Sequence, residues 1–230
     1  MLQRENHSAF QNRAVEFIKD GYQSMVFADM GTGKTTTTLT ALLDVDEWPV
    51  LVISTKRVVD EVWEQEAACW EHTQNLTFVN ITGNLKQRKA CLTGASAHIY
   101  MINVENIQWL MTQKNTPSFR SLVLDELSLW GGMGERWKAL RKFAAEMDSV
   151  IALTGTPAAN GYLKLWAMTE MVKPGMISRT KTQYLQKYFF PVDPDCRIWE
   201  LRPGAEQEIL KTIAPYVIRM SNSDLAMPEL

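Results

Sequence analysis

The sequence has few cysteines, no strong excess of charge of either sign and no long apolar run. The three cysteines, at positions 69, 91 and 196, are scattered and lack the spacing of metal ligands, which argues against a disulfide framework or a zinc site. The formal net charge of the 230 residues is −2, so any binding of nucleic acid requires a local surface. No segment approaches the ~20 apolar residues of a membrane span, and residues 1–7 are polar, unlike a signal peptide. We therefore expect a reduced, cytoplasmic globular protein with no membrane attachment.

Short apolar runs rich in β-branched residues alternate with amphipathic stretches along the chain. The runs are almost continuously apolar, which is typical of parallel strands that are buried on both faces. They predict strands over residues 24–27, 50–54, 76–81, 98–102, 121–124 and 150–153. The stretches between them carry apolar residues at helical spacing. This alternation predicts an α/β fold, with a mostly parallel sheet and helices on both of its faces.

Two of the helical stripes contain tryptophan, and we assign Trp63, Trp70 and Trp137 to the core rather than to a binding site. Parallel strands connected by right-handed crossovers end at one edge of the sheet, so chemistry is expected just after each strand. The composition changes near residue 172. We therefore divide the chain into a lobe over residues 1–172 and a helical extension over residues 173–230, with a loop at 191–195 and a last helix over 206–217.

A glycine-rich loop follows the first predicted strand and precedes a segment that can be helical. Residues 28–35 read Ala-Asp-Met-Gly-Thr-Gly-Lys-Thr, the pattern of a phosphate-binding loop. Its glycines let successive backbone N–H groups point at one anion, and the helix N-terminus adds partial positive charge. Lys34 would reach the β- and γ-phosphates of ATP, and Thr35 would bind Mg²⁺. The residues expected to bind the nucleotide here are Met30, Gly31, Thr32, Gly33, Lys34, Thr35 and Thr36.

An acidic pair, Asp125 and Glu126, ends the fifth predicted strand. An acid at the tip of a strand beside a phosphate loop is where a P-loop NTPase needs one. Asp125 would hold the Mg²⁺, and Glu126 would orient or deprotonate the water that attacks the γ-phosphate. Taken alone, the pair can also be an acidic N-cap of the following turn. With Lys34 as the third catalytic group, the combination favours ATP hydrolysis.

Two further segments carry a resemblance to a known family. Residues 125–128 read Asp-Glu-Leu-Ser, and residues 151–161 read Ile-Ala-Leu-Thr-Gly-Thr-Pro-Ala-Ala-Asn-Gly, with Leu165-Trp166 following. This pattern resembles the Swi/Snf-like branch of superfamily-two helicases, and is most similar to its compact phage-encoded members. The resemblance covers nearly the whole chain. It implies the N-terminal RecA-like lobe of an ATP-dependent DNA helicase or translocase, with ATP and Mg²⁺ as cofactors, in the host cytoplasm if the chain is phage-encoded.

The resemblance also implies roles for residues outside the phosphate loop. Gln11 matches an upstream glutamine that reads the adenine edge. Thr154, Gly155 and Thr156 match a segment that couples the γ-phosphate site to the DNA path, although the threonines can also be turn residues ahead of Pro157. The residues expected to contact the DNA backbone, independently of base sequence, are Ser54, Thr55, Lys56, Thr82, Gly83 and Asn103.

Two positions depart from the family pattern. Ser128 stands where many relatives carry histidine, and the glycine-rich segment 129–134 stands where many carry a lysine. The contacts just after the acidic pair are therefore expected to differ from those of the relatives. The local basic candidates for DNA contact are Lys56, Arg57, Lys86, Arg88 and Lys89, although residues 86–89 can also form a solvated helix face.

A motor of this family needs two RecA-like lobes, and the end of this sequence resembles the segment that leads to the hinge between them. The resemblance therefore implies lobe one, with a second lobe acting in cis or in trans. The second lobe would supply an arginine finger, which contributes roughly 10³–10⁵ in rate. We expect the chain alone to bind ATP weakly and to hydrolyse it very slowly.

Two other functions remain compatible with the sequence. One is a stand-alone interaction module, which resembles a helicase and binds nucleotide or DNA without productive turnover. The other is a P-loop phosphotransferase, which is disfavoured because no acceptor-binding lid is apparent and because residues 154–157 would have no purpose in it. A motor should lose its biological activity when Lys34 or Glu126 is substituted, whereas an interaction module should keep it.

Overall fold

The main sheet of the protein has seven strands, all parallel, in the order β3-β4-β2-β5-β6-β1-β9. The computed structural model describes residues 1–94, 96–155, 161–195 and 197–221. The strands of this sheet are β1 Gln23–Ala28, β2 Val50–Ser54, β3 Phe78–Asn80, β4 Ile99–Asn103, β5 Ser121–Asp125, β6 Ser149–Thr154 and β9 Val217–Met220. The expectation of an α/β fold with a mostly parallel sheet is confirmed.

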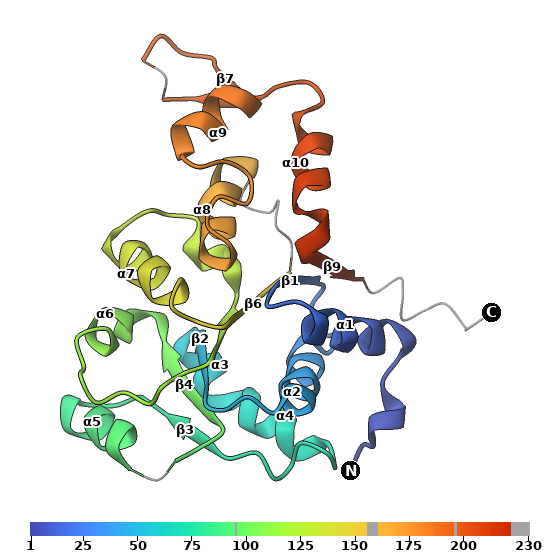
Figure 1. Ribbon diagram of the computed structural model, residues 1–230, viewed down its shortest axis with the longest axis vertical. Coiled ribbons are helices and arrows are strands. Elements are labelled where there is room, and N and C mark those ends of the chain that lie inside the picture. Colours follow the sequence, from blue (N-terminus) through green and yellow to red (C-terminus); the bar gives the residue numbers. More distant parts are fainter. Residues whose placement is uncertain (95, 156–160, 196, 222–230) are drawn as a thin grey trace.

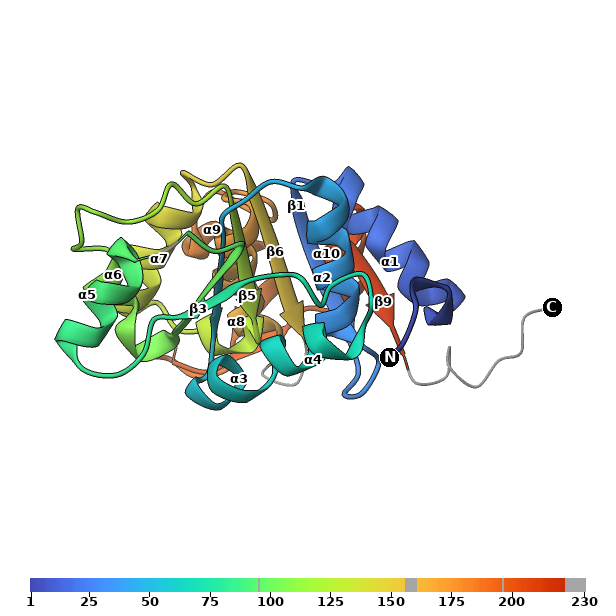
Figure 2. The ribbon, with the colours of Figure 1, turned by 90° about the horizontal axis from the view of Figure 1, so that it is seen from below.

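Helices cover both faces of this sheet (Figures 1 and 2). One face packs against α1 Ala9–Asp20, α2 Lys34–Val45, α3 Lys56–Glu61 and α4 Trp63–Cys69. The apolar core on the other face is formed with α5 Leu85–Thr93, α6 Ile107–Leu110, α7 Glu135–Ala144 and α8 Tyr162–Val172, and it continues outward into α9 Lys181–Tyr188 and α10 Ala205–Ile213. Short 3-10 turns lie at η1 Arg4–Asn6, η2 Val104–Asn106, η3 Leu127–Trp130 and η4 Ala214–Tyr216.

The two faces explain why the strands are continuously apolar. On β2, Leu51 and Ile53 enter the core under α5–α10, whereas Val50 and Val52 enter the core under α1–α4. Successive side chains of a strand point to opposite faces, so a strand with helices on both faces needs apolar residues at every position. No described helix is long and apolar enough to cross a bilayer.

All six strands predicted from the sequence are present, although β3 is shorter than expected. The seventh strand, β9, was not predicted, and the last predicted helix was wrong beyond Ile213. There the chain forms η4 and then β9, which pairs with β1 through Met25 and Val217. Four residues at a sheet edge carry too little periodicity to be recognised, and Pro215 ends the helical pattern early. The division of the chain at residue 172 stays a prediction.

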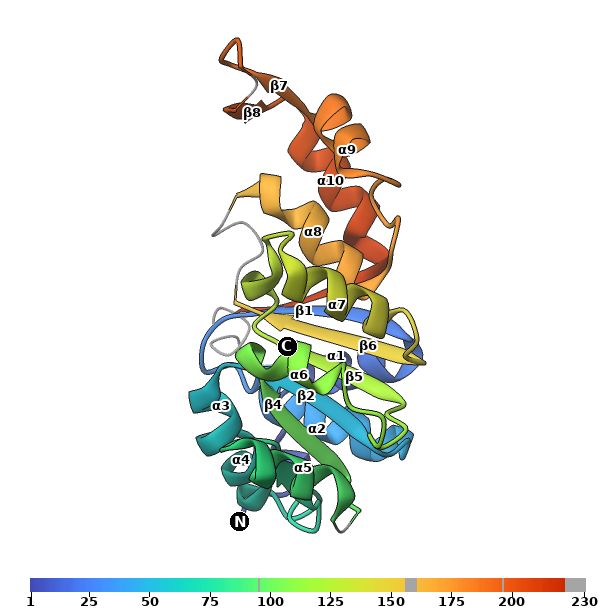
Figure 3. The same ribbon diagram turned by 90° about the vertical axis from the view of Figure 1, so that its left-hand side faces the viewer.

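The elements α9, β7 Phe189–Pro191, β8 Trp199–Leu201 and α10, here called the projection, extend away from the sheet (Figure 3). β7 and β8 pair antiparallel in a hairpin that the sequence did not predict. The projection has an aromatic interior, in which Tyr184, Tyr188 and Phe189 are at most 2% exposed. An ion pair between Lys187 and Glu208 links α9 to α10 on the outside.

Candidate nucleotide site and nucleic-acid interface

The predicted functional residues lie where the parallel strands end, along one edge of the sheet. The phosphate loop follows β1, the acidic pair follows β5, and Thr154 ends β6, which pairs with β1 on one side and β5 on the other. β9 flanks β1 on its other side, and the backbone N–H of Asp29 donates to the Met220 carbonyl over 3.0 Å. The start of the phosphate loop is therefore fixed from both neighbouring strands.

The phosphate loop has the backbone geometry that its glycines allow. Gly31 and Gly33 have φ angles of 81° and 80°, in the left-handed region that favours glycine. A Cβ atom at Gly33 would lie 2.3 Å from Nε2 of Gln11, so a side chain there would displace the Gln11 amide from its position. Thr32 is buried, and its hydroxyl donates to the Asp29 carbonyl over 2.8 Å. Met30 is 88% exposed, so the loop is open to solvent on its outer side.

Lys34 begins α2, and its ammonium group donates to the Ala28 carbonyl over 3.0 Å. The side chain therefore lies across the base of the loop. The free N–H groups of the first turn of α2 face the same space, which favours an anion there. Gly155 lies close to the same carbonyl, since a Cβ atom on it would be 3.9 Å from the Ala28 carbonyl oxygen. This arrangement fits a nucleotide phosphate.

Gln11 connects the start of α1 to the phosphate loop. Its Oε1 accepts from the backbone N–H of Ser8 over 2.8 Å and lies 3.1 Å from the Ser8 hydroxyl. Its Nε2 donates to the Thr32 carbonyl over 3.2 Å. Gln11 is thus one half of a capping box on α1 as well as a contact of the loop. Its role in reading adenine stays a prediction.

Asp125 lies at the end of β5, and burial raises the pKa of its carboxyl above the usual range. A hydrogen bond from Trp63 Nε1 to Asp125 Oδ2, 2.9 Å long, opposes this effect and lowers the pKa. The positive charge of Lys34 and the Ser54 hydroxyl act in the same direction as Trp63. A carboxylate oriented by an indole and facing Lys34 fits the single acidic contact that Mg²⁺ needs beside a nucleotide.

Glu126 has an unusual backbone conformation for a residue other than glycine, with φ 75° and ψ 71°. Its Oε1 accepts from the Ser128 hydroxyl over 2.5 Å, from the Ser128 backbone N–H over 3.3 Å and from the Thr154 hydroxyl over 3.0 Å. A left-handed conformation of such a residue costs about 1–3 kcal/mol and persists where surrounding contacts maintain it. Two of the predicted residues, Glu126 and Thr154, are therefore in direct contact.

The predicted nucleic-acid residues lie at the ends of β2, β3 and β4, but they differ in exposure. Lys56 is exposed and pairs with Asp60 one helical turn away. Thr55 and Thr82 are half-buried and Gly83 is exposed. Ser54 is only 1% exposed. Its role as a DNA contact is a prediction that this burial does not favour.

Asn103 is 7% exposed and belongs to a hydrogen-bonded network rather than standing free. Its Nδ2 donates to Glu105 Oε2 over 2.5 Å, and its Oδ1 accepts from Asn106 Nδ2 over 2.5 Å. Arg88 donates to Asn106 over 2.6 Å and stacks over the Trp109 ring at 4.4 Å. The side chain of Arg88 is thus already held by contacts within the protein. Among the described residues, Lys86 and Lys89 make no ion pair, so they remain available to a phosphate.

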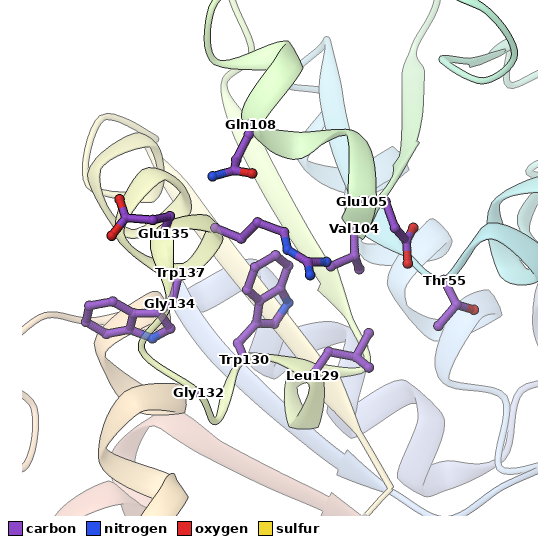
Figure 4. A pocket seen from close by; sticks show the side chains of 11 residues that line it. Thr55, Val104, Glu105, Gln108, Leu129, Trp130, Gly132, Gly134, Glu135 and Trp137 are labelled. Carbon is purple, nitrogen blue, oxygen red and sulfur yellow. The ribbon is translucent and has the colours of Figure 1, made fainter.

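A cavity of about 450 Å³ lies between the ends of β2 and β4 and the start of α7. Figure 4 shows Thr55 and Glu105 at one end of it and Glu135 and Trp137 at the other, with Trp130 between them. The pKa of Glu105 is lowered mainly by the hydrogen bond from Asn103, with a smaller contribution from the charge of Arg136. No local sequence pattern predicts this cavity, because its walls come from three separate segments.

Sequence reasoning missed two residues that orient the acidic pair. Trp63 was assigned to the core, and it is fully buried, but its indole N–H also holds Asp125. A buried tryptophan needs an acceptor for that group, which is the signal that could have drawn attention to it. Ser128 stands out in the sequence only as a departure from the family pattern.

The predicted coupling residue Thr156 lies outside the described residues, together with residues 157–160 and the end of the chain from residue 222.

The described residues contain no group of three or more histidine, cysteine, aspartate or glutamate side chains that could hold a metal ion by themselves. Mg²⁺ in a nucleotide site differs from such a centre, because it is held by one or two protein oxygens together with the phosphates of the substrate. Thr35, half-buried in the first turn of α2, and Asp125 at the tip of β5 fit this requirement.

Comparison with known proteins agrees with this geometry. The profile of the SNF2-related domain family matches residues 10–230. A phage protein, putative protein p41 of Acyrthosiphon pisum secondary endosymbiont phage 1, is 32% identical over 193 residues, which are 78% of this chain and 42% of the phage protein. The ATP-dependent helicase MG018 of Mycoplasma genitalium is 24% identical over 236 residues, or 96% of this chain and 21% of that protein.

Among solved structures, the SWI2/SNF2 ATPase core of Sulfolobus solfataricus, determined in complex with dsDNA, superimposes with a TM-score of 0.74. Its sequence is 20% identical, and the match covers 96% of this chain and 46% of that one. This likeness confirms the RecA-like fold. The chain spans less than half the length of each of these three proteins. Together with the family profile, these matches show that the chain belongs to the SNF2-related domain family.

Proposed function

We propose that the chain is the ATP-binding lobe of an ATP-dependent DNA translocase or helicase. The observation that carries this proposal is the contact between Glu126 and Thr154 beside the phosphate loop. A loop that only bound nucleotide would not require a carboxylate held in one orientation just after β5. A carboxylate oriented next to the expected γ-phosphate position is what hydrolysis requires.

The described residues divide the work on ATP among them. The backbone N–H groups of residues 31–36 would receive the phosphates, and Lys34 would contact the β- and γ-phosphates. Thr35 and Asp125 would hold Mg²⁺, which when bound offsets the negative charge of the phosphates. Gln11 would contact the adenine. Glu126 would accept the proton of the attacking water, whose oxygen forms the new bond to the γ-phosphorus as the bond to ADP breaks.

DNA would be held by its backbone at the ends of β2, β3 and β4. The support is the position of Thr55, Lys56, Thr82 and Gly83 on this edge, together with the two unpaired lysines of α5 and the DNA-bound state of the archaeal relative. The ion pair of Lys56 with Asp60 is exposed, and such pairs contribute only about 0–1 kcal/mol. Lys56 can therefore exchange that partner for a phosphate at little cost.

Productive turnover would need a second RecA-like lobe, supplied in cis or in trans. The exposure of Met30 on the outer side of the phosphate loop supports this part of the proposal, because within the described part of the chain that side is open to a partner. An arginine finger from such a lobe would add roughly 10³–10⁵ in rate. The isolated 230 residues should therefore bind ATP weakly and hydrolyse it very slowly.

Titration of the 230-residue chain with a fluorescent ATP analogue and Mg²⁺ tests the nucleotide site. Lys34→Ala should raise the dissociation constant at least 10-fold, whereas Lys142→Ala, an exposed lysine on α7, should leave it unchanged. Equal binding by all three proteins would refute the site. Strong DNA-stimulated hydrolysis by the wild-type chain alone would refute the need for a second lobe.

Binding to double-stranded DNA of random sequence tests the nucleic-acid surface. The affinity should fall as salt rises, because each phosphate contact releases counterions. Lys56→Ala should weaken binding and reduce the salt dependence, and Lys142→Ala again serves as the matched control. Retention of biological activity by Lys34→Ala and Glu126→Gln would instead support an interaction module without turnover.

A further inference from the structure

The geometry points to Ser128 as a positioning residue that fixes the orientation of the Glu126 carboxylate, an inference that rests on the proposed hydrolytic function. Ser128 does not touch the reacting atoms in this assignment. It acts by holding one oxygen of Glu126, so that the other oxygen is presented to the attacking water.

The two oxygens of Glu126 have different surroundings. Three donors converge on Oε1, namely the Ser128 hydroxyl at 2.5 Å, the Thr154 hydroxyl at 3.0 Å and the Ser128 backbone N–H at 3.3 Å. Within the described part of the chain, no hydrogen bond reaches Oε2. A carboxylate is planar, so anchoring one oxygen restricts where the other can lie. Oε1 is thereby the anchor and Oε2 is the atom left to accept a proton.

The donors approach from two separate elements. Thr154 is 1% exposed at the end of β6, a central strand, and its position is set by the sheet. Ser128 lies in η3, between the buried residues Leu127 and Trp130, which are 0% and 2% exposed. Because η3 is pinned into the core on both sides of Ser128, the hydroxyl is held in place. Removing the Ser128 hydroxyl would leave only the two longer hydrogen bonds, from the Ser128 backbone N–H and the Thr154 hydroxyl, so the carboxylate would be held less firmly.

The backbone of Glu126 shows why the local contact is needed. With φ at 75° the residue is in the left-handed region, which is unfavourable for a residue other than glycine. Glu126 is the N-cap of η3, and its side chain accepts from the Ser128 N–H as capping side chains do. The Ser128 hydroxyl adds the shortest of the three hydrogen bonds. This turn therefore holds Glu126 at the sheet edge in one conformation, which is the preorganisation that proton transfer requires.

Three variants test the role of Ser128. Ser128→Ala removes the hydroxyl and keeps the backbone N–H, Ser128→Thr keeps a hydroxyl, and Ser178→Ala removes a serine hydroxyl that donates to the Thr180 carbonyl in the segment between α8 and α9. The measurements are single-turnover hydrolysis of radiolabelled ATP by excess protein over hours with DNA present, the dissociation constant for ATP, and the midpoint of unfolding in urea.

Ser128→Ala should lower the rate of hydrolysis about 10- to 100-fold, because displacing a reacting group by about 1 Å has an effect of that size. The dissociation constant for ATP and the midpoint of unfolding should stay at the wild-type values. Ser128→Thr should restore most of the rate, and Ser178→Ala should behave as wild type.

Three outcomes would overturn the inference, and they are distinguishable from one another. If Glu126→Gln abolishes hydrolysis while Ser128→Ala retains the wild-type rate, the positioning role fails and the proposed function stands. If the wild type shows no hydrolysis that depends on Lys34 and Glu126, both fail together. A loss of rate in Ser128→Ala accompanied by an equal loss of ATP binding and of stability would assign Ser128 a merely structural role.

Discussion

The edge where the strands end and the projection are held together by different kinds of interaction. At the edge, the side chains of the proposed ATP site are polar, and hydrogen bonds orient them, as those from Ser128 and Thr154 orient Glu126. In the projection, aromatic and aliphatic side chains fill a common interior, and Tyr184 and Ile209 are completely buried. Directional contacts fix where an atom points, whereas apolar packing mainly fixes whether the chain is folded.

This difference separates chemistry from stability. A substitution at the edge should change rates or ligand affinity and leave the free energy of unfolding almost intact. A substitution in the projection should do the reverse. Substitutions in either region can test this contrast. A variant that changes both the hydrolysis rate or ligand affinity and the free energy of unfolding would show that the two regions are coupled.

Glu126→Gln tests the edge most severely. The amide keeps the size of the side chain but cannot accept the proton of water, so the rate of ATP hydrolysis should fall about 10²- to 10⁴-fold. Single-turnover hydrolysis measures this loss, and urea unfolding should give the wild-type midpoint. A variant that hydrolyses ATP at the wild-type rate would contradict the role of Glu126 as the base.

Ile209→Ala tests the projection. The side chain is 0% exposed on α10, so its truncation should lower the free energy of unfolding by about 2–5 kcal/mol through lost burial and a residual cavity. Thermal or urea unfolding measures this change. The dissociation constant for ATP should be unchanged in the folded variant, and a large rise in it would break the separation of the two regions.

Trp63→Phe keeps the aromatic packing at the edge but removes the donor to Asp125. A hydrogen bond to the charged form lowers a pKa, so its loss should raise the pKa of Asp125 beyond the increase that burial already causes. The affinity for Mg²⁺ should fall about 10- to 100-fold, as for other residues that orient a metal ligand.

The pH dependence of nucleotide binding gives a second readout of Trp63→Phe. Mg²⁺ requires the charged carboxylate, so binding should be lost as the pH falls, and in the variant it should be lost at a higher pH than in the wild type. Mg²⁺ titrations at several pH values measure both effects. Identical curves for the two proteins would show that the indole does not control Asp125.

The pH dependence of the free energy of unfolding also distinguishes the two regions, and the expected effect is smaller. His7, directly before the cap of α1, is 6% exposed and packs against Trp70 at 4.6 Å and His72 at 5.7 Å. Burial lowers the pKa of His7 to about 4, and the charges of His72 and Arg4 act in the same direction. The unfolded chain therefore binds the proton more readily, and stability should decrease as the pH falls from about 6.5 towards 4.

His7→Phe should remove most of this dependence, worth about 1–2 kcal/mol between pH 7.5 and pH 5. The measurement is urea unfolding of both proteins at these two pH values. Ile209→Ala, altered only in the projection, should keep the wild-type pH dependence. If the slopes of wild type and His7→Phe agree, another group governs the acid sensitivity.

The sequence predicted the sheet well because its signals are local. Five of the six recognised strands are apolar runs buried on both faces, β3 at the sheet edge being only half-buried, and the phosphate loop lies within eight consecutive residues. β9 escaped recognition because its strand character comes from pairing with β1, a contact between distant segments. The hairpin of the projection was missed for the same reason, since β7 and β8 have only three residues each.

The sequence predicted which residues belong to the candidate site, but not which of them contact one another. Lys34, Asp125, Glu126 and Thr154 were named from local motifs, and the structure places them at one edge. The exposure of each residue depends on what packs over it, so the burial of Ser54 could not be read from its neighbours in sequence.

By itself, the sequence determined the fold class, the phosphate loop and the acidic pair, because backbone conformation and hydrophobic periodicity are set by neighbouring residues. Only the tertiary structure decided that the indole of Trp63 holds Asp125, and that Ser128 and Thr154 hold the same oxygen of Glu126. Trp63 and Asp125 lie on different elements far apart in the chain, as do Glu126 and Thr154. Hydrogen bonds depend on the distance and direction between atoms, which for such residues only the folded sheet brings into register.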